Sequence, residues 1–144
     1  MSMIWIKNVI QIIHDIRVAL GLNENNGTFS KKSTIENAGM GLFATQNFKK
    51  NDFIDFYTGD IIFQKEKLSE QNKYLFFNEK EGFFIDGKNG NSMRLINHHK
   101  QNSNCAFEYY ELPDIRILYP IVVCVKDIKI GDELLCDYGS YYDI

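Results

Sequence analysis

The sequence predicts an α+β domain composed mostly of short β-strands, with an amphipathic helix ahead of them. The chain has 144 residues, which fits a single domain. Hydrophobic residues form 44% of it and aromatic residues 14%, so the chain can bury a core of its own. Helical periodicity marks the first 22 residues, and short runs of β-forming residues follow.

The helix is expected within residues 1–22. Its apolar side chains recur at helical spacing, at Ile6, Val9, Ile10, Ile13, Ile16 and Leu20. Polar residues between them make the segment too polar to span a bilayer or to serve as a signal peptide. The apolar stripe is expected to pack on its own domain, with a homodimer contact or a membrane surface as alternatives. The polar stretch Gly21–Lys32 is expected to be the loop that ends the helix.

The strands are expected where β-forming residues stand between turn residues. The runs are Gly41–Ala44, Phe53–Phe56, Ile61–Phe63, Leu75–Phe77, Phe83–Ile85, Ala106–Tyr110 and Ile115–Val125. The charged stretch Gln64–Lys73 is expected to form a short helix or a mobile insert. We expect residues 1–31 to be an N-terminal helix and loop, and residues 32–144 to be the main domain.

Charge is divided unevenly along the chain. Residues 1–50 carry six Lys and Arg against three Asp and Glu, and residues 51–144 carry ten against sixteen. The acidic second part would attract a basic partner such as a lysine-rich peptide, and no basic stripe indicates a nucleic-acid face. A solvated surface without a partner is the alternative. The three cysteines are too widely spaced for a disulfide framework or a zinc site, and are expected to stay reduced in an intracellular compartment.

Two glycine-containing motifs stand early in the strand-rich part. In residues 38–41 (AGMG), the glycines would let the backbone approach a ligand closely, with a simple β-turn as the alternative. In residues 57–60 (YTGD), Tyr57 could present its hydroxyl to a narrow slot, or be an ordinary core aromatic at a strand end.

Two polar motifs follow. Residues 94–99 (RLINHH) place a guanidinium, an amide and two imidazoles together. Adjacent histidines in a strand point to opposite faces and no third ligand is near, so no metal site is expected. Residues 133–139 (ELLCDYG) place Tyr138 at a strand end, where its hydroxyl could enter a site. Cys136 has no neighbouring base that would make it a nucleophile.

In this order, GMG, YTGD, RLINHH and ELLCDYG resemble the motifs of SET-domain lysine methyltransferases. The resemblance runs from about Lys32 to Gly139 and makes residues 32–144 the SET domain. It looks closest to the branch that methylates the histone 4 tail, and small viral and bacterial members are similarly compact. It implies the SET fold, in which the Asn-His segment and the C-terminal segment form a pseudoknot, against the usual rule that connections do not thread.

The resemblance also implies S-adenosylmethionine as the cofactor. The residues implied for cofactor binding are Ala38, Met40, Gly41, Tyr74, Arg94, Asn97 and His98. Tyr138 matches the family's catalytic tyrosine, and Tyr57 would flank the methyl-transfer site with it. The residues implied for the substrate channel are Tyr57, Tyr74, Phe107 and Cys136.

The sequence departs from the family pattern at several positions. Asp60 stands where glutamate is usual, His99 and Lys100 replace a serine-containing pair, and one residue is inserted before Asn104. Cys136 occupies the position where an aromatic side chain usually limits how many methyl groups are added. Because the thiol is small, we expect di- or trimethylation.

We therefore expect an enzyme that methylates a lysine of a protein, most often a histone tail in this family, without metal or covalent catalysis. Action on chromatin would place it in a nucleus, which is the host's nucleus if the source is viral or bacterial. The alternative is a catalytically silent SET-like module that binds a peptide or partner.

Overall fold

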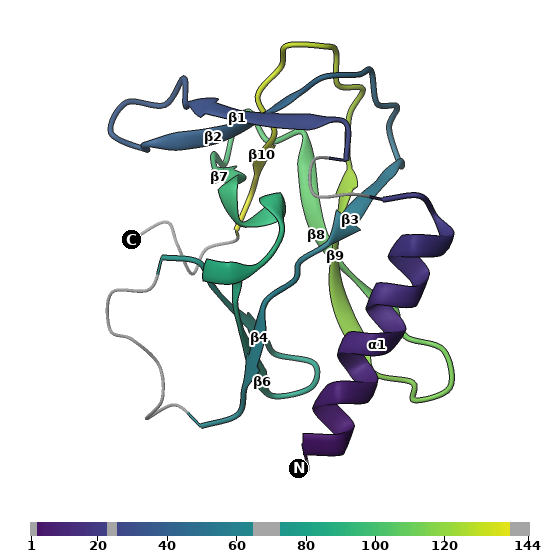
Figure 1. Ribbon diagram of the computed structural model, residues 1–144. Coiled ribbons are helices and arrows are strands. Elements are labelled where there is room, and N and C mark those ends of the chain that lie inside the picture. The colour runs from purple at the N-terminus through teal and green to yellow at the C-terminus, as the bar shows by residue number, and fades with distance from the viewer. Residues whose placement is uncertain (1–2, 23–25, 65–72, 139–144) are drawn as a thin grey trace.

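The computed structural model describes residues 3–22, 26–64 and 73–138 (Figure 1). The helix α1 spans Met3–Ala19. The strands are β1 (Thr28–Lys32), β2 (Met40–Ala44), β3 (Phe53–Phe56), β4 (Asp60–Ile62), β5 (Leu75–Asn78), β6 (Phe83–Asp86), β7 (Asn97–His98), β8 (Cys105–Glu111), β9 (Leu118–Cys124) and β10 (Leu135–Cys136). The 3-10 helices η2 (Gly87–Asn89) and η3 (Ser92–Leu95) lie between β6 and β7. The predicted α+β architecture with mostly short strands is confirmed.

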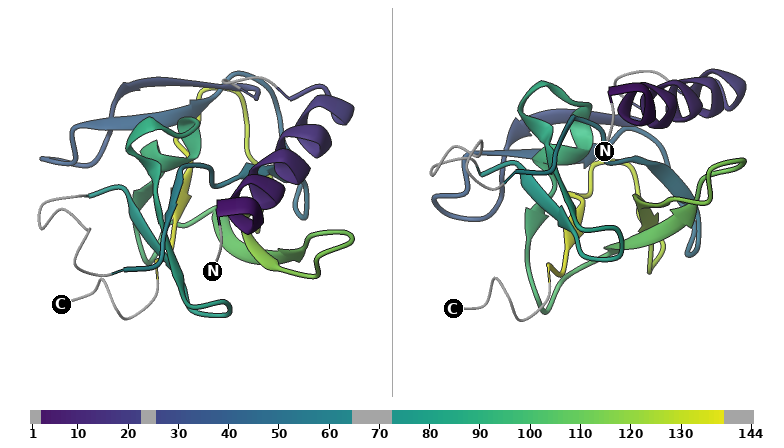
Figure 2. Two further views of the ribbon diagram at one scale, coloured as in Figure 1. Left: turned by 60° about the horizontal axis from the view of Figure 1, so that its bottom comes forward. Right: turned by 90° about the horizontal axis from the view of Figure 1, so that it is seen from below.

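Helix α1 packs along one flank of the strands, as Figures 1 and 2 show from three directions. Val9 and Ile13 are buried in the common core, so the helix packs on its own domain as expected. The buried face is rotated from the predicted stripe: Trp5 and Ile12, which are not part of that stripe, also pack on the core. Ile10 is 49% exposed and Leu20 lies beyond the helix end. Within the described residues, no helix is long and apolar enough to cross a membrane.

The strands form a two-stranded sheet (β1-β2), a three-stranded sheet (β4-β6-β5) and a five-stranded sheet in the order β3-β9-β8-β10-β7. In the five-stranded sheet, β10 runs parallel to both of its neighbours, β7 and β8. The connection from β7 to β8, residues 99–104, must therefore cross β10. The last strand, β10, therefore lies between two strands that the earlier chain joins across it, and this is the pseudoknot expected from the resemblance.

Part of the expected loop at Gly21–Lys32 is a strand. Thr28–Lys32 forms β1 and pairs antiparallel with β2, with Thr28 opposite Ala44 and Lys32 opposite Met40. Only the first residue of β1 is buried, so its sequence carries no apolar pattern from which a strand could be predicted. The boundary expected between residues 31 and 32 falls inside this strand.

Most other strands lie where the runs of β-forming residues predict them. The run Ile115–Val125 is too long, since β9 begins only at Leu118. Asp114 and Arg116 adopt left-handed backbone angles in the turn before it, and a strand cannot continue through them. Residues 65–72 of the charged stretch and Gly139 of the last motif lie outside the described residues.

A buried ion pair ties α1, β3 and η3 together. The Asp55 carboxylate on β3 is fully buried, and the Nε and Nη2 atoms of Arg17 donate to its two oxygens at 2.9 Å each. Asn91 Nδ2 donates to the same carboxylate at 3.0 Å, while the Asn91 side chain caps η3. Burial raises the pKa of Asp55 above its ordinary value, although the Arg17 guanidinium acts to lower it. This contact fixes η3, which leads directly into β7.

Candidate active site

Strands β7 and β10 bring the two polar motifs side by side (Figure 1). Asn97 lies opposite Leu135 and His98 lies opposite Cys136 in parallel register. Two residues beyond Cys136, the backbone N–H of Tyr138 donates to Nδ1 of His98 at 2.9 Å. Nδ1 of His98 is therefore the acceptor in this bond, and the bond joins β7 to the segment that follows β10.

The GMG motif lies against the same segment. Its Gly39 has a left-handed φ of 72°, which turns the chain into β2. Asn97 Nδ2 donates to the backbone oxygen of Met40 at 3.0 Å, so the amide of β7 holds the tip of the β1–β2 hairpin. The predicted cofactor-binding residues Met40, Asn97 and His98 thus form one continuous group.

The Glu133 carboxylate lies beneath this group, and it was not singled out from the sequence. Its Oε1 accepts from the backbone and the hydroxyl of Thr34, and its Oε2 accepts from the Ser33 hydroxyl at 2.7 Å and from Asn97 Nδ2 at 3.4 Å. Burial alone would raise the pKa of Glu133, but these hydrogen bonds hold that pKa below its ordinary value. A Cβ at Gly41 would lie 2.3 Å from Oε2, so Gly41 provides the space that the carboxylate occupies.

Four aromatic rings form a cluster next to β7 and β10. The Phe107 ring centroid lies 5.0 Å from that of Phe76, 5.9 Å from that of Tyr57 and 5.7 Å from that of Tyr138. Tyr57 and Phe76 are themselves 5.4 Å apart. Phe76 is a cluster member that sequence reasoning missed, although the alternation of YLFF places it two residues from Tyr74.

The tyrosine hydroxyls of the cluster bind backbone oxygens. Tyr138 Oη donates to the backbone oxygen of Ile96, just before β7. Tyr57 Oη donates to the backbone oxygen of Tyr74, just before β5. Tyr138 therefore contacts both groups of the site, through His98 on one side and through Phe107 on the other.

Tyr74 and Arg94 lie together at the edge of this arrangement. The Arg94 guanidinium carbon is 5.7 Å from the Tyr74 ring centroid, within range of a cation–π contact. Arg94 Nη1 also donates to the backbone oxygens of Gly90 and Asn91 at 3.2 and 2.9 Å. Arg94 is thus bound to its own 3-10 turn, and its guanidinium faces the predicted cofactor residue Tyr74.

Cys136 is fully buried beside two other thiols. Its backbone pairs with Cys105, which in turn pairs with Cys124, so the three cysteines form a row across β10, β8 and β9. All three are free thiols. The hydrogen bond with Cys105 and burial raise the pKa of the Cys124 thiol. Among the described residues, no group of three or more His, Cys, Asp or Glu side chains could hold a metal ion.

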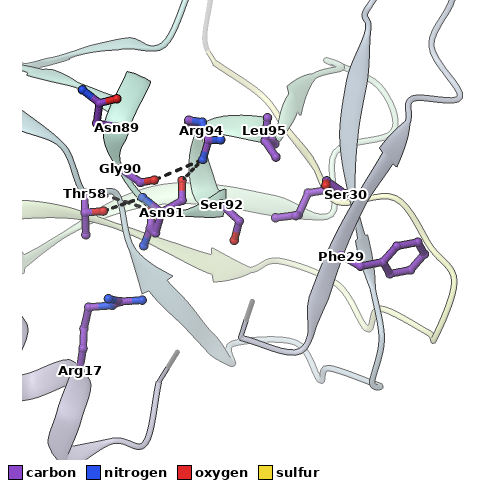
Figure 3. A pocket seen from close by; sticks show the side chains of 11 residues that line it. Arg17, Phe29, Ser30, Thr58, Asn89, Gly90, Asn91, Ser92, Arg94 and Leu95 are labelled. Atoms are coloured by element: carbon purple, nitrogen blue, oxygen red, sulfur yellow. Dashed lines mark hydrogen bonds between the residues drawn. The ribbon is translucent and has the colours of Figure 1, made fainter. Parts of the chain in front are cut away.

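A cavity of about 420 Å³ is lined in part by residues of η3 (Figure 3). Arg17 of α1 and Arg94 of η3 approach it from opposite sides, and Ser30 of β1 and Ser92 of η3 also line it. Of the residues predicted to bind the cofactor, Arg94 alone lines this cavity. The hydrogen bonds and ring contacts around Asn97 and Tyr138, rather than this cavity, therefore define the candidate site.

The crossed strands and the Asn-His-Tyr arrangement define a class of protein. The SET domain family profile matches residues 39–139, and the chain belongs to this family. The chain is 34% identical over 125 residues to the histone-lysine N-methyltransferase EZH2 of Chaetomium thermophilum, covering 77% of this chain and 8% of that protein. It is 35% identical over 119 residues to the N-lysine methyltransferase KMT5A-A of Danio rerio, covering 74% of this chain and 34% of that protein.

Solved structures of SET-domain complexes share the fold. The autoinhibited Chaetomium thermophilum polycomb repressive complex 2 bound to S-adenosylmethionine matches with a TM-score of 0.69 at 30% identity, over 80% of this chain and 15% of that chain. An active polycomb repressive complex 2 in the stimulated state matches with a TM-score of 0.69 at 27% identity, over 87% of this chain and 16% of that chain. The chain therefore spans a small part of these relatives.

Proposed function

We propose that this chain transfers methyl groups from S-adenosylmethionine to a lysine side chain of a protein, with a histone tail as the substrate. The observation that carries the proposal is the position of Tyr138. Its backbone binds His98, in the group of residues predicted to bind the cofactor, and its ring packs on Phe107, in the aromatic cluster. The similarity to a histone-lysine N-methyltransferase and to an N-lysine methyltransferase supports the same reaction.

The residues around Met40 fit the amino-acid and adenosine parts of such a cofactor. Gly39 and Met40 are exposed and Gly41 is buried, while Asn97 and His98 are half-buried beside them. The imidazole of His98 and the side-chain amide of Asn97 are donor and acceptor groups of the kinds that a nucleoside and an α-amino acid require. S-adenosylmethionine would supply the methyl group on a positively charged sulfur.

The aromatic cluster would prepare the lysine. A lysine amine must lose its proton before it can attack, against an unperturbed pKa of about 10.4. Insertion among the rings of Tyr57, Phe76 and Phe107 would disfavour the ammonium form by desolvation. The hydroxyls of Tyr57 and Tyr138 would then orient the lone pair of the amine toward the methyl group.

A methyl-transfer assay on free histones and nucleosomes, read by mass spectrometry, tests the proposal. The wild-type chain is expected to modify a lysine, and Tyr138→Phe is expected to reduce the rate at least about tenfold while binding S-adenosylmethionine normally. Binding of the cofactor without transfer to any histone or lysate protein would instead indicate a silent binding module. Absence of both would show that the proposed reaction is wrong.

Cys136 leads us to propose that the products include di- and trimethyllysine. The side chain is small and lies against the Cys105 thiol, where a family member with an aromatic residue would place a ring. The variant Cys136→Tyr is expected to shift the products toward monomethyllysine. A wild-type chain that stops at monomethyllysine at long reaction times would contradict this part of the proposal.

The substrate and the compartment follow from the proposed reaction. The acidic second part of the chain favours a basic peptide, which a histone tail provides. Action on histones would place the chain in a nucleus, or in the host's nucleus if its source is a virus or bacterium.

A further inference from the structure

The Glu133 carboxylate joins three segments that the proposed function assigns to cofactor binding and to the hairpin that supports it. It binds Thr34 and Ser33 between β1 and β2, it binds Asn97 on β7, and it lies against the backbone of Gly41. Glu133 is only 7% exposed, so it contacts the protein rather than solvent. Glu133 lies two residues before β10, and Tyr138 lies two residues after it.

We propose that Glu133 is a positioning residue for the cofactor, because its carboxylate fixes the amide of Asn97 in the orientation that binding requires. The inference rests on the proposed function. Asn97 Nδ2 has two acceptors, Glu133 Oε2 at 3.4 Å and the Met40 backbone oxygen at 3.0 Å. With both amide hydrogens directed into the protein, Oδ1 is the atom that remains to accept from a ligand.

The charge of Glu133 has a specific role in this arrangement. Oε1 must be an acceptor, since the backbone N–H of Thr34 can only donate. In Glu133→Gln the amide nitrogen is therefore expected at the Oε2 position, where the Ser33 hydroxyl can rotate and accept from it. Asn97 Nδ2 would then face another donor, and turning its amide to avoid this would break the bond to Met40. The variant should release Asn97 while it retains the hydrogen bonds of Thr34.

Calorimetric titration with S-adenosylmethionine on the full chain tests this inference. Glu133→Gln is expected to weaken binding about tenfold or more, as loss of a hydrogen bond to a charged group does. Ser33→Ala is the matched control, because it removes a hydrogen bond from the same Oε2 but leaves that oxygen for Asn97; its affinity should stay within about threefold of wild type. In an Asn97→Ala background, Glu133→Gln should cause no further loss.

The outcomes separate positioning from a purely structural role. An unchanged affinity in Glu133→Gln, or an equal loss with and without Asn97, would overturn the inference. A wild-type chain that does not bind S-adenosylmethionine would instead overturn the proposed function.

A second variant keeps the test open if Glu133→Gln does not fold. Asn97→Asp places two carboxylates together, and one of them must take up a proton before they can share a hydrogen bond. The affinity of Asn97→Asp for S-adenosylmethionine should therefore improve as the pH falls from about 8 to about 6, more than that of Asn97→Ala. Parallel pH profiles for these two variants would also overturn the inference.

Discussion

Replacing Arg17 by methionine tests how α1 supports the site. Asp55 is fully buried, and Arg17 supplies its neutralising charge and two hydrogen bonds of 2.9 Å. Loss of one partner of a buried ion pair costs about 3–5 kcal/mol, because the other charge stays buried. The backbone N–H of Phe56 and the amide of Asn91 still bind Asp55, at 2.7 and 3.0 Å, so we expect a loss near about 3 kcal/mol, the lower end of that range.

Urea unfolding of Arg17→Met measures this loss. With a denaturant slope of about 2 kcal/mol per molar, the midpoint should fall by about 1.5 M. Gln11→Ala is the control on the same helix, because its hydrogen bond to Asp15 is exposed and should contribute under about 0.5 kcal/mol.

The loss in Arg17→Met should also depend on pH. Burial raises the pKa of Asp55, and without Arg17 the largest opposing contributions are gone, so the folded-state pKa rises further above the unfolded one. A carboxyl group with a raised folded-state pKa costs stability as the pH rises through that pKa. The deficit should be largest near pH 8 and smaller near pH 5. A deficit under about 1 kcal/mol at pH 8, or one that does not shrink on acidification, would refute this account of the buried pair.

Two further predictions concern the site. Gly41→Ala should lower stability by about 1–3 kcal/mol and weaken cofactor binding, because the new Cβ displaces the Glu133 carboxylate. Gly39→Asn is the control and should be tolerated, since asparagine accepts a left-handed φ and nothing lies within 4 Å of a Cβ there. Thermal unfolding and cofactor titration of both variants check this prediction, and equal effects of the two substitutions would contradict it. The three thiols are buried, and the pKa of Cys124 is raised, so they should not react with iodoacetamide in the folded chain and should react fully in urea. Intact-mass spectrometry measures the labelling, and rapid labelling under native conditions would contradict their burial.

Features that depend on local sequence patterns, such as strand positions and motif residues, can be predicted from the sequence. Turn residues and β-forming runs locate strands such as β3, β5 and β6, and the four motifs name Tyr57, Asn97, His98 and Tyr138, which the structure brings into two adjoining groups. Their individual roles toward cofactor and substrate remain predictions. The topology came from the family resemblance, since spacing alone cannot indicate that β10 inserts between β7 and β8.

Other features of the site depend on contacts that have no local pattern. Ser33 and Glu133 are 100 positions apart, and neither spacing nor composition predicts their hydrogen bond. The strand β1 escapes prediction because its stability comes from pairing with β2 rather than from an apolar face. Gly41 was interpreted as space for a ligand, but the nearest group that a Cβ would meet is the Glu133 carboxylate.

The register of β10 connects the two groups of the site. Strand side chains alternate between faces, so a shift of one residue would move Tyr138 by about 3.3 Å and turn its ring away from Phe107. Asn104 fixes this register: its Nδ2 donates to the Glu133 backbone oxygen and its Oδ1 accepts from the Leu135 N–H, both at 2.9 Å. Its own backbone N–H donates to the Leu135 oxygen at the same distance. Because Asn104 itself keeps Glu133 beneath Asn97 and Tyr138 beside His98, we expect the crossing loop to absorb the insertion that the resemblance implies before Asn104.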